Sequence, residues 1–260
     1  MRLPPAEYIG AVNAETDKLI AVARTVAMTD PVPSAPGWSV ADLVWHLTRV
    51  QRFWATIVSE RLMTPEGYPE PTRPDDDGSL IDGLDAAKTF LVATLSEADP
   101  DLACYTWSDE HNAGFVMRRQ AHEALIHRAD AELAAGIDPV VASRLAVDGI
   151  DEILTVMIGA VPSWATFTDS GRVIDIDAGQ QRWALLMGKM TGTSPNSGTD
   201  YDIDVAVVVD EVPHPDAVIS GTPGKLDLWL WGRAPGETID IAGDPALADL
   251  LRSIAVEATQ

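Results

Sequence analysis

Three side chains in this sequence have the chemistry to bind one divalent metal ion: His46, Glu123 and His127. Glu123 and His127 are four residues apart, which is about 40° around an α-helix, so their side chains leave the same helix face. Two imidazoles and one carboxylate are a ligand set of catalytic zinc sites, in which a fourth position stays open for water or substrate. The E-x-x-x-H spacing is also an ordinary polar pair on a helix surface. The spacing alone therefore leaves both interpretations open.

His46 lies in the first two turns of a predicted helix from residue 40 to about residue 62, beside its apolar stripe. A lone histidine in such a place is usually a hydrogen-bonded core or boundary residue. A second helix that carries Glu123 and His127 favours the interpretation of His46 as a third ligand. His122 lies about 140° from His127 around the same helix and is expected to face another way.

The elements that position these residues are four predicted helices, over residues 5–28, 40–62, 79–98 and 115–135. Ser39 with Asp42 forms a capping-box pattern at the start of the second helix. Gly136 is a typical stop for the fourth. Four helices with two long connections predict a four-helix bundle, whose interior commonly holds metal ligands from facing helices.

The apolar period changes from about 3.6 to 2 beyond a fifth predicted helix, which follows Asp138 and Pro139 and ends near residues 159–162. Strands are predicted at residues 172–177, 182–187, 201–209 and 239–241, and residues 218–223 are predicted as a short strand that leads into a helix. Helices are predicted at residues 224–231 and 245–254. We therefore expect two domains, a helical bundle over residues 1–162 and a smaller α+β domain over residues 163–260.

The chain is acidic, with 18 Lys and Arg against 40 Asp and Glu and a net charge of −22. This uniform acidity argues against nucleic acid or an anionic membrane surface as a partner, because both would require clustered basic residues. The N-terminal residues MRLPPAEYIG carry no apolar run of signal length, and no segment reaches the roughly 18 apolar residues of a membrane span. We therefore expect neither a signal peptide nor a membrane helix. Cys104 is the single cysteine, which excludes an internal disulfide and favours a reducing compartment. We expect a cytoplasmic protein, as a monomer or a small homo-oligomer.

Two N-terminal segments, GWSVADLVWHL (residues 37–47) and RRQAHEALIHRADAE (residues 118–132), resemble the mycothiol-dependent maleylpyruvate isomerase family. Its N-terminal domain is a branch of the DinB-like four-helix bundles. The segments GTPGKLDLWLWGR (residues 221–233) and GDPALADLL (residues 243–251) resemble that family's C-terminal domain, which has a sterol-carrier-like α+β fold. One departure is Ala129, where family members commonly carry an aromatic residue. This difference does not touch a ligand, but it bears on the opening of the pocket and on the substrate.

The resemblance implies a zinc ion held by His46, Glu123 and His127, with the sulfur of the low-molecular-weight thiol mycothiol at the open position. The thiolate would attack a small electrophilic substrate and give either cis–trans isomerisation or thiol transfer. We therefore expect a small electrophilic molecule as the partner of the protein. Cys104 is not needed, because the reactive sulfur comes from outside the chain.

Three charged residues have two interpretations each. Arg233, at the end of a predicted helix, is expected either to bind a substrate carboxylate as a catalytic residue in a cleft between the domains or to cap that helix. Asp130 is expected either to orient a ligand or to form a structural ion pair. Arg128 is expected either to orient a ligand or, with somewhat more weight, to form a surface or interdomain salt bridge.

Two alternative functions stay open on the sequence. The protein could be a non-catalytic binder of small apolar ligands, or a hydrolase in which zinc-bound water attacks. The presence of all three ligand types favours an enzyme over the binder, and a thiol requirement would separate thiol chemistry from hydrolysis.

Overall fold

The computed structural model describes residues 2–195, 197–210 and 214–259. The chain folds into two compact units. One unit is Arg2–Val140, and the other begins at Val141. The helical part followed by an α+β part confirms the predicted fold class.

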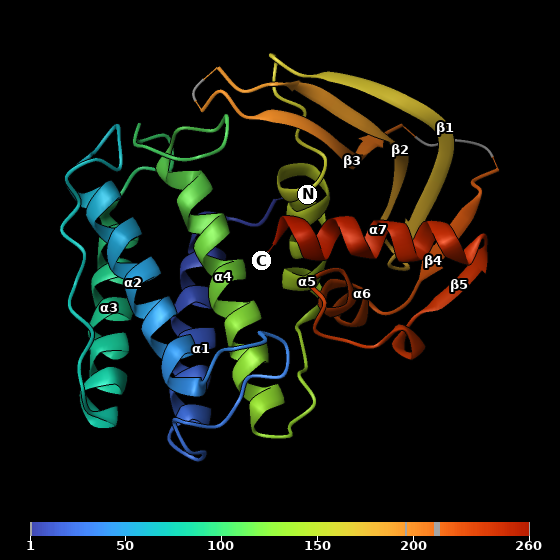
Figure 1. Ribbon diagram of the computed structural model, residues 1–260. Coiled ribbons are helices and arrows are strands. Elements are labelled where there is room, and N and C mark those ends of the chain that lie inside the picture. Colours follow the sequence, from blue (N-terminus) through green and yellow to red (C-terminus); the bar gives the residue numbers. More distant parts are fainter. Residues whose placement is uncertain (1, 196, 211–213, 260) are drawn as a thin grey trace. The chain divides into compact units, whose positions relative to one another are not determined.

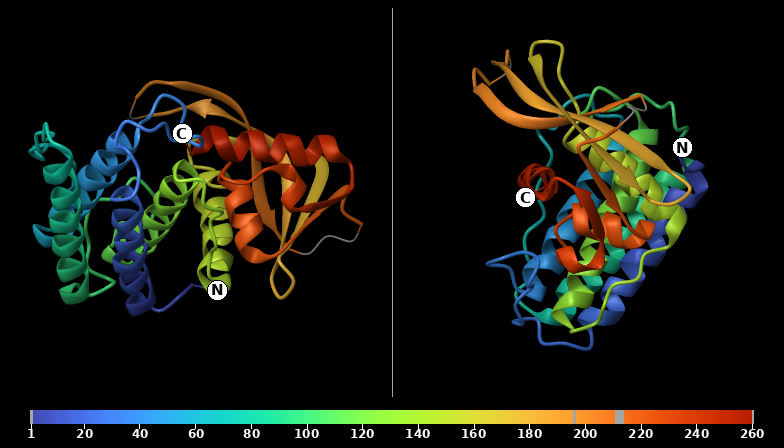
Figure 2. Two further views of the ribbon diagram at one scale, coloured as in Figure 1. Left: turned by 90° about the horizontal axis from the view of Figure 1, so that it is seen from below. Right: turned by 90° about the vertical axis from the view of Figure 1, so that its right-hand side faces the viewer.

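The first unit is a bundle of four helices (Figures 1 and 2), each of them close to its predicted position: α1 (Pro5–Ala23), α2 (Val40–Ser59), α3 (Asp77–Glu97) and α4 (Ala113–Ala134). Helix α1 packs against α4, α2 packs against α3, and α2 also contacts α4. Helices α2 and α4 run in opposite directions (Figure 1). Two metal-ligand candidates on α4 can therefore face one on α2.

Side-chain caps explain where these helices begin. Ser39 and Asp42 form the predicted capping box at α2, in which each side chain accepts a hydrogen bond from the other residue's backbone. Helix α3 begins at Asp77, earlier than expected, because Asp76 accepts a hydrogen bond from the amide of Ser79. Helix α2 ends at Ser59 rather than near residue 62, and Arg61 just beyond it has a positive φ of 54°.

A buried ion-pair network joins α1 to α4 within the bundle. The Nε atom of Arg128 lies 2.7 Å from the Glu15 carboxylate, and Nη1 pairs with Glu132 one turn later on α4. The Arg128 side chain is only 2% exposed, and Nη2 donates to the carbonyl of Val140. The expectation of a surface or interdomain salt bridge for Arg128 is therefore wrong. Its charge is matched inside the first unit, by two carboxylates that the bundle places around it.

The second unit contains one mixed sheet of five strands in the order β3-β2-β1-β4-β5. Strands β1 and β4 pair in parallel, and the other pairs are antiparallel. The strands are β1 (Thr166–Asp177), β2 (Arg182–Thr193), β3 (Asp200–Val209), β4 (Ala217–Ser220) and β5 (Asp240–Gly243). The helices are α5 (Ser143–Glu152), continued by the π-helical turn η1 (Ile153–Met157), then α6 (Pro223–Leu230), the short 3-10 helix η2 (Gly236–Thr238) and α7 (Pro245–Ala258).

The division between the units falls after Val140, about twenty residues before the predicted junction at residue 162. Helix α5 belongs to the second unit because it packs closely against α6. A Cβ atom on Gly149 of α5 would lie 2.7 Å from a carboxylate oxygen of Asp227 on α6, so glycine permits this approach. The sequence pattern of a fifth helix did not reveal which unit the helix packs against.

We expect Arg128→Ala to lower the free energy of unfolding by about 3 kcal/mol, because it removes the ion pair with the buried Glu15, which then keeps the exposed Lys18 as its partner, and the ion pair with the partly buried Glu132. Urea unfolding followed by circular dichroism measures this change. Arg73→Ala is the matched control: it breaks an exposed ion pair with Asp42 and should cost less than about 1 kcal/mol. Equal losses in the two variants would contradict the buried-network interpretation.

Candidate metal centre

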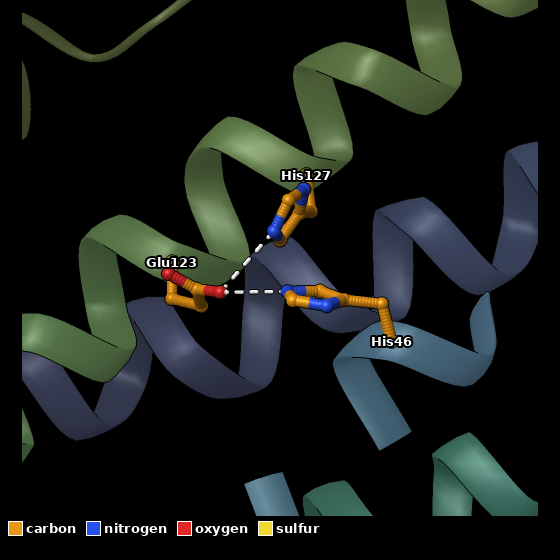
Figure 3. A group of neighbouring side chains, drawn as sticks. All are labelled: His46, Glu123 and His127. Atoms are coloured by element: carbon orange, nitrogen blue, oxygen red, sulfur yellow. Dashed lines mark hydrogen bonds and ion pairs between the residues drawn. The ribbon is translucent and has the colours of Figure 1, made fainter. Parts of the chain in front are cut away.

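The bundle brings His46 of α2 together with Glu123 and His127 of α4 (Figure 3). In the part of the chain that the structure describes, they form the one group of three His, Cys, Asp or Glu side chains spaced to hold a metal ion. One donor atom from each residue lies within 4.8 Å of the other two. The three candidates chosen from the sequence thus lie together at one point between two antiparallel helices.

The distances in this group suit a small divalent ion. Glu123 Oε1 lies 3.2 Å from Nε2 of His46 and 3.2 Å from Nε2 of His127. Donor atoms about 2.0–2.1 Å from a tetrahedral zinc ion are about 3.3 Å apart, so these two separations agree with that geometry. The three donor atoms all lie within 4.8 Å of one another. The two histidine rings cross at 74° with their centroids 4.8 Å apart. The residues therefore fit a zinc ion with two nitrogen ligands and one oxygen ligand.

The Glu123 carboxylate is held in its charged form. Burial would raise its pKa, but the hydrogen bond and charge of His127, the hydrogen bond to His46 and the charge of Arg119 lower it well below the usual value. The Nη2 atom of Arg119 lies 3.3 Å from Glu123 Oε2, on the opposite oxygen from the imidazoles. One carboxylate oxygen thus faces the imidazoles while the other contacts a nearly buried arginine.

Asp130 contacts the His127 ring. Its Oδ2 lies 2.9 Å from His127 Nδ1, one turn further along α4, and its carboxylate is completely buried. The hydroxyl of Ser34 donates to the other oxygen of Asp130. A carboxylate on Nδ1 fixes the imidazole tautomer and leaves Nε2 for a metal. The contact is the one that a ligand-orienting role of Asp130 requires, and that role stays a prediction.

The indole of Trp38 forms a wall of the site that the sequence analysis did not single out. Its ring centroid lies 4.9 Å from that of His46 and 6.3 Å from that of His127, and it stacks on the latter at 24°. Trp38 directly precedes the capping box of α2, and this position places the ring beside His46. The signal that was available was the GWS motif ahead of that helix.

Two further candidate donors lie away from this site. His122 is fully buried and packs with its ring edge-to-face against Tyr8 of α1, at 6.4 Å between centroids. Cys104 is buried too, and burial raises the pKa of its thiol to about 11. A thiol with so high a pKa is protonated at neutral pH and is a poor nucleophile.

Family models cover most of the chain. The mycothiol maleylpyruvate isomerase N-terminal domain matches residues 9–132, and the C-terminal domain of the same family matches residues 144–250. The chain belongs to the mycothiol-dependent maleylpyruvate isomerase family. The resemblance of the four sequence segments is thereby confirmed, and the two matched regions meet close to the division between the compact units.

Solved structures of the family share the fold. A crystal structure of the mycothiol-dependent maleylpyruvate isomerase matches with a TM-score of 0.56 at 14% identity, over 92% of this chain and 93% of that chain. A histidine-to-alanine mutant of that enzyme matches with a TM-score of 0.57 at the same identity and coverage. No curated protein matches the chain in sequence.

None of the described helices is both long enough and apolar enough to cross a membrane.

Arg233 lies in the C-terminal domain of this family fold, just after α6. Its Nη1 donates to the carbonyl of Trp231 over 2.5 Å, and its amide donates to the carbonyl of Leu228. These contacts correspond to the helix-capping interpretation. A role of Arg233 in binding a substrate carboxylate stays a prediction.

In the metal-free protein we expect His127 to titrate near pH 9. Burial lowers its pKa, but the hydrogen bonds and charges of Asp130 and Glu123 outweigh burial and raise it to about 9. This pKa exceeds that of a histidine in the unfolded chain, about 6.5. Protonation of His127 therefore stabilises the metal-free fold, and the full contribution is present below about pH 6.5. This contribution disappears as the pH rises through 9.

NMR titration of the histidine ring signals measures this pKa directly. Asp130→Asn should lower the pKa of His127, because the variant removes one of its two negative partners. His111→Gln, at an exposed histidine in the segment before α4, is the matched control and should leave the His127 signal unchanged. An unaltered His127 titration in Asp130→Asn would contradict the orienting contact.

Proposed function

We propose that this protein is a zinc-dependent enzyme that uses mycothiol as its thiol cofactor or co-substrate and acts on a small electrophilic substrate. The observation that carries the proposal is the cluster of His46, Glu123 and His127, whose donor separations suit zinc. Membership of a mycothiol-dependent isomerase family supports the thiol and an isomerase-like reaction, cis–trans isomerisation. Thiol transfer is the other reaction that attack by the same thiolate would give.

The residues of the site would have three separate roles: metal binding, orientation of a ligand and exclusion of water. His46, Glu123 and His127 would hold the metal, Asp130 would fix the ring of His127, and Trp38 would cover both imidazoles and limit access of water. Zinc bound there would stabilise a coordinated thiolate at neutral pH, which is the nucleophilic form of a thiol. The chain's own thiol at Cys104 is buried and protonated, so an external thiol is required.

Single substitutions of the three ligands test the metal site without any assay of activity. We expect one zinc per chain in the wild type and a loss of most of this zinc in His46→Ala, Glu123→Ala and His127→Ala, because two ligands cannot hold the ion tightly. Elemental analysis of the purified proteins measures it. His111→Ala is the matched control, since this histidine is exposed and separate from the cluster. Unchanged zinc content in any of the three variants would refute the shared site.

Calorimetric titration with mycothiol tests the thiol. We expect the zinc-loaded protein to bind mycothiol and release a proton, because the thiol must ionise to coordinate the metal. The zinc-free protein should show no binding. Zinc without thiol binding would instead favour a hydrolase that activates water, and absence of zinc after reconstitution would favour a non-catalytic binding protein.

A further inference from the structure

A cavity of about 200 Å³ opens beside the metal site within the first unit. It shares one residue with that site, because His46 forms part of its wall. From His46 the cavity follows one face of α2 through positions spaced three and four residues apart. The loop between α2 and α3 supplies the opposite side. The lining residues besides His46 and Arg49 are Val50, Phe53, Trp54, Tyr68 and Glu70.

Aromatic rings form most of the apolar wall. The Phe53 ring meets Tyr68 edge-to-face at 5.1 Å between centroids and meets Trp54 in the same way at 5.0 Å. Behind them Tyr105 stacks on Trp54 at 6.3 Å. Each ring is thus held by another in the geometry that aromatic pairs prefer. The wall is preorganised for a further planar, apolar group.

The charges at the rim compensate each other. Arg49 Nη2 lies 2.6 Å from the carboxylate of Glu70, and both residues line the cavity. Arg52 interacts with Tyr68 but does not line the cavity. The Arg49 and Glu70 side chains are largely exposed, at 43% and 66%, and a carboxylate on the substrate would compete with Glu70 for Arg49. An uncharged group avoids this competition and the repulsion from Glu70.

We propose that this aromatic pocket, formed by Val50, Phe53, Trp54 and Tyr68 beside His46, binds an uncharged aryl group of the electrophilic substrate. The size agrees, because an apolar cavity of about 150 Å³ already accommodates benzene. An aryl ring seated there would place its substituent next to His46, and hence next to the thiol. The inference rests on the proposed function and names the substrate class: aryl-substituted electrophiles rather than dicarboxylates.

The first experiment compares two enones with the same reacting group in the presence of mycothiol and the zinc-loaded protein. Benzylideneacetone carries a phenyl group where ethylideneacetone carries a methyl group. In either addition the thiolate sulfur forms a bond to the β-carbon, the π-electron pair moves to the α-carbon, and that carbon takes up a proton. We expect kcat/KM, divided by the uncatalysed rate, to be at least about tenfold higher for the phenyl compound.

The outcomes of this comparison separate the two proposals. Equal normalised rates for the two enones, or a preference for maleylpyruvate over benzylideneacetone, would overturn the aryl pocket while leaving the thiol enzyme intact. Failure of every electrophile, together with absence of mycothiol binding, would overturn the proposed function itself.

A second measurement needs no turnover. Benzylacetone, the saturated and unreactive analogue, should bind to the zinc-loaded protein in ligand-observed NMR. Tyr68→Ala should weaken this binding about tenfold, because it removes one ring of the wall. Arg73→Ala is the matched control, because Arg73 lies in the same loop as Tyr68 but does not line the cavity. This variant breaks the ion pair of Arg73 with Asp42 of α2. Unchanged binding in Tyr68→Ala, or displacement of mycothiol by benzylacetone, would refute the assignment of this pocket to the substrate's aryl group.

Discussion

The carboxylate of Glu123 is the interaction on which the site depends. One of its oxygens contacts an imidazole from each of two helices, at 3.2 Å in both cases, while its other oxygen contacts Arg119. A carboxylate inside a helical bundle is costly unless its charge is compensated. Here the histidines and the arginine compensate it, and the same arrangement leaves three donors converging on one point. The two histidines that help to compensate the charge of Glu123 are thus also the residues that, together with Glu123, are spaced to hold a cation.

The support for His127 extends well outward from the metal site. Asp130 contacts its Nδ1 atom, Ser34 contacts Asp130, and Trp38 covers the ring. Ser34 and Trp38 both lie in the loop that precedes α2. That loop therefore contributes to the site in two ways: it caps the helix that carries His46, and it supports the ligand on the facing helix. The proline-rich loop before α2 thus contacts residues of both helices that carry the candidate ligands.

Family membership establishes the fold of this protein, whereas the pocket beside His46 is described only by its own residues. The two family domains cover nearly the whole chain, and the crystal structures at 14% identity share its fold. The aromatic rings next to His46 and the ion pair of Arg49 with Glu70 are observed in this chain itself, and the proposed aryl pocket rests on them.

Sequence by itself determined the helices of the bundle, the change to strands, the candidate ligands and the family. The helices, the strands and the candidate ligand pair follow from local signals: apolar periods, caps such as Ser39 with Asp42, and the i, i+4 spacing of Glu123 and His127. The family followed from the resemblance of four sequence segments. Tertiary structure alone decided that His46 reaches Glu123, that Arg128 is buried between α1 and α4, and that α5 packs with the second unit. It also decided the contact of Ser34 with Asp130. These outcomes depend on distances between residues far apart in the chain, which arise from how helix faces pack rather than from any local pattern.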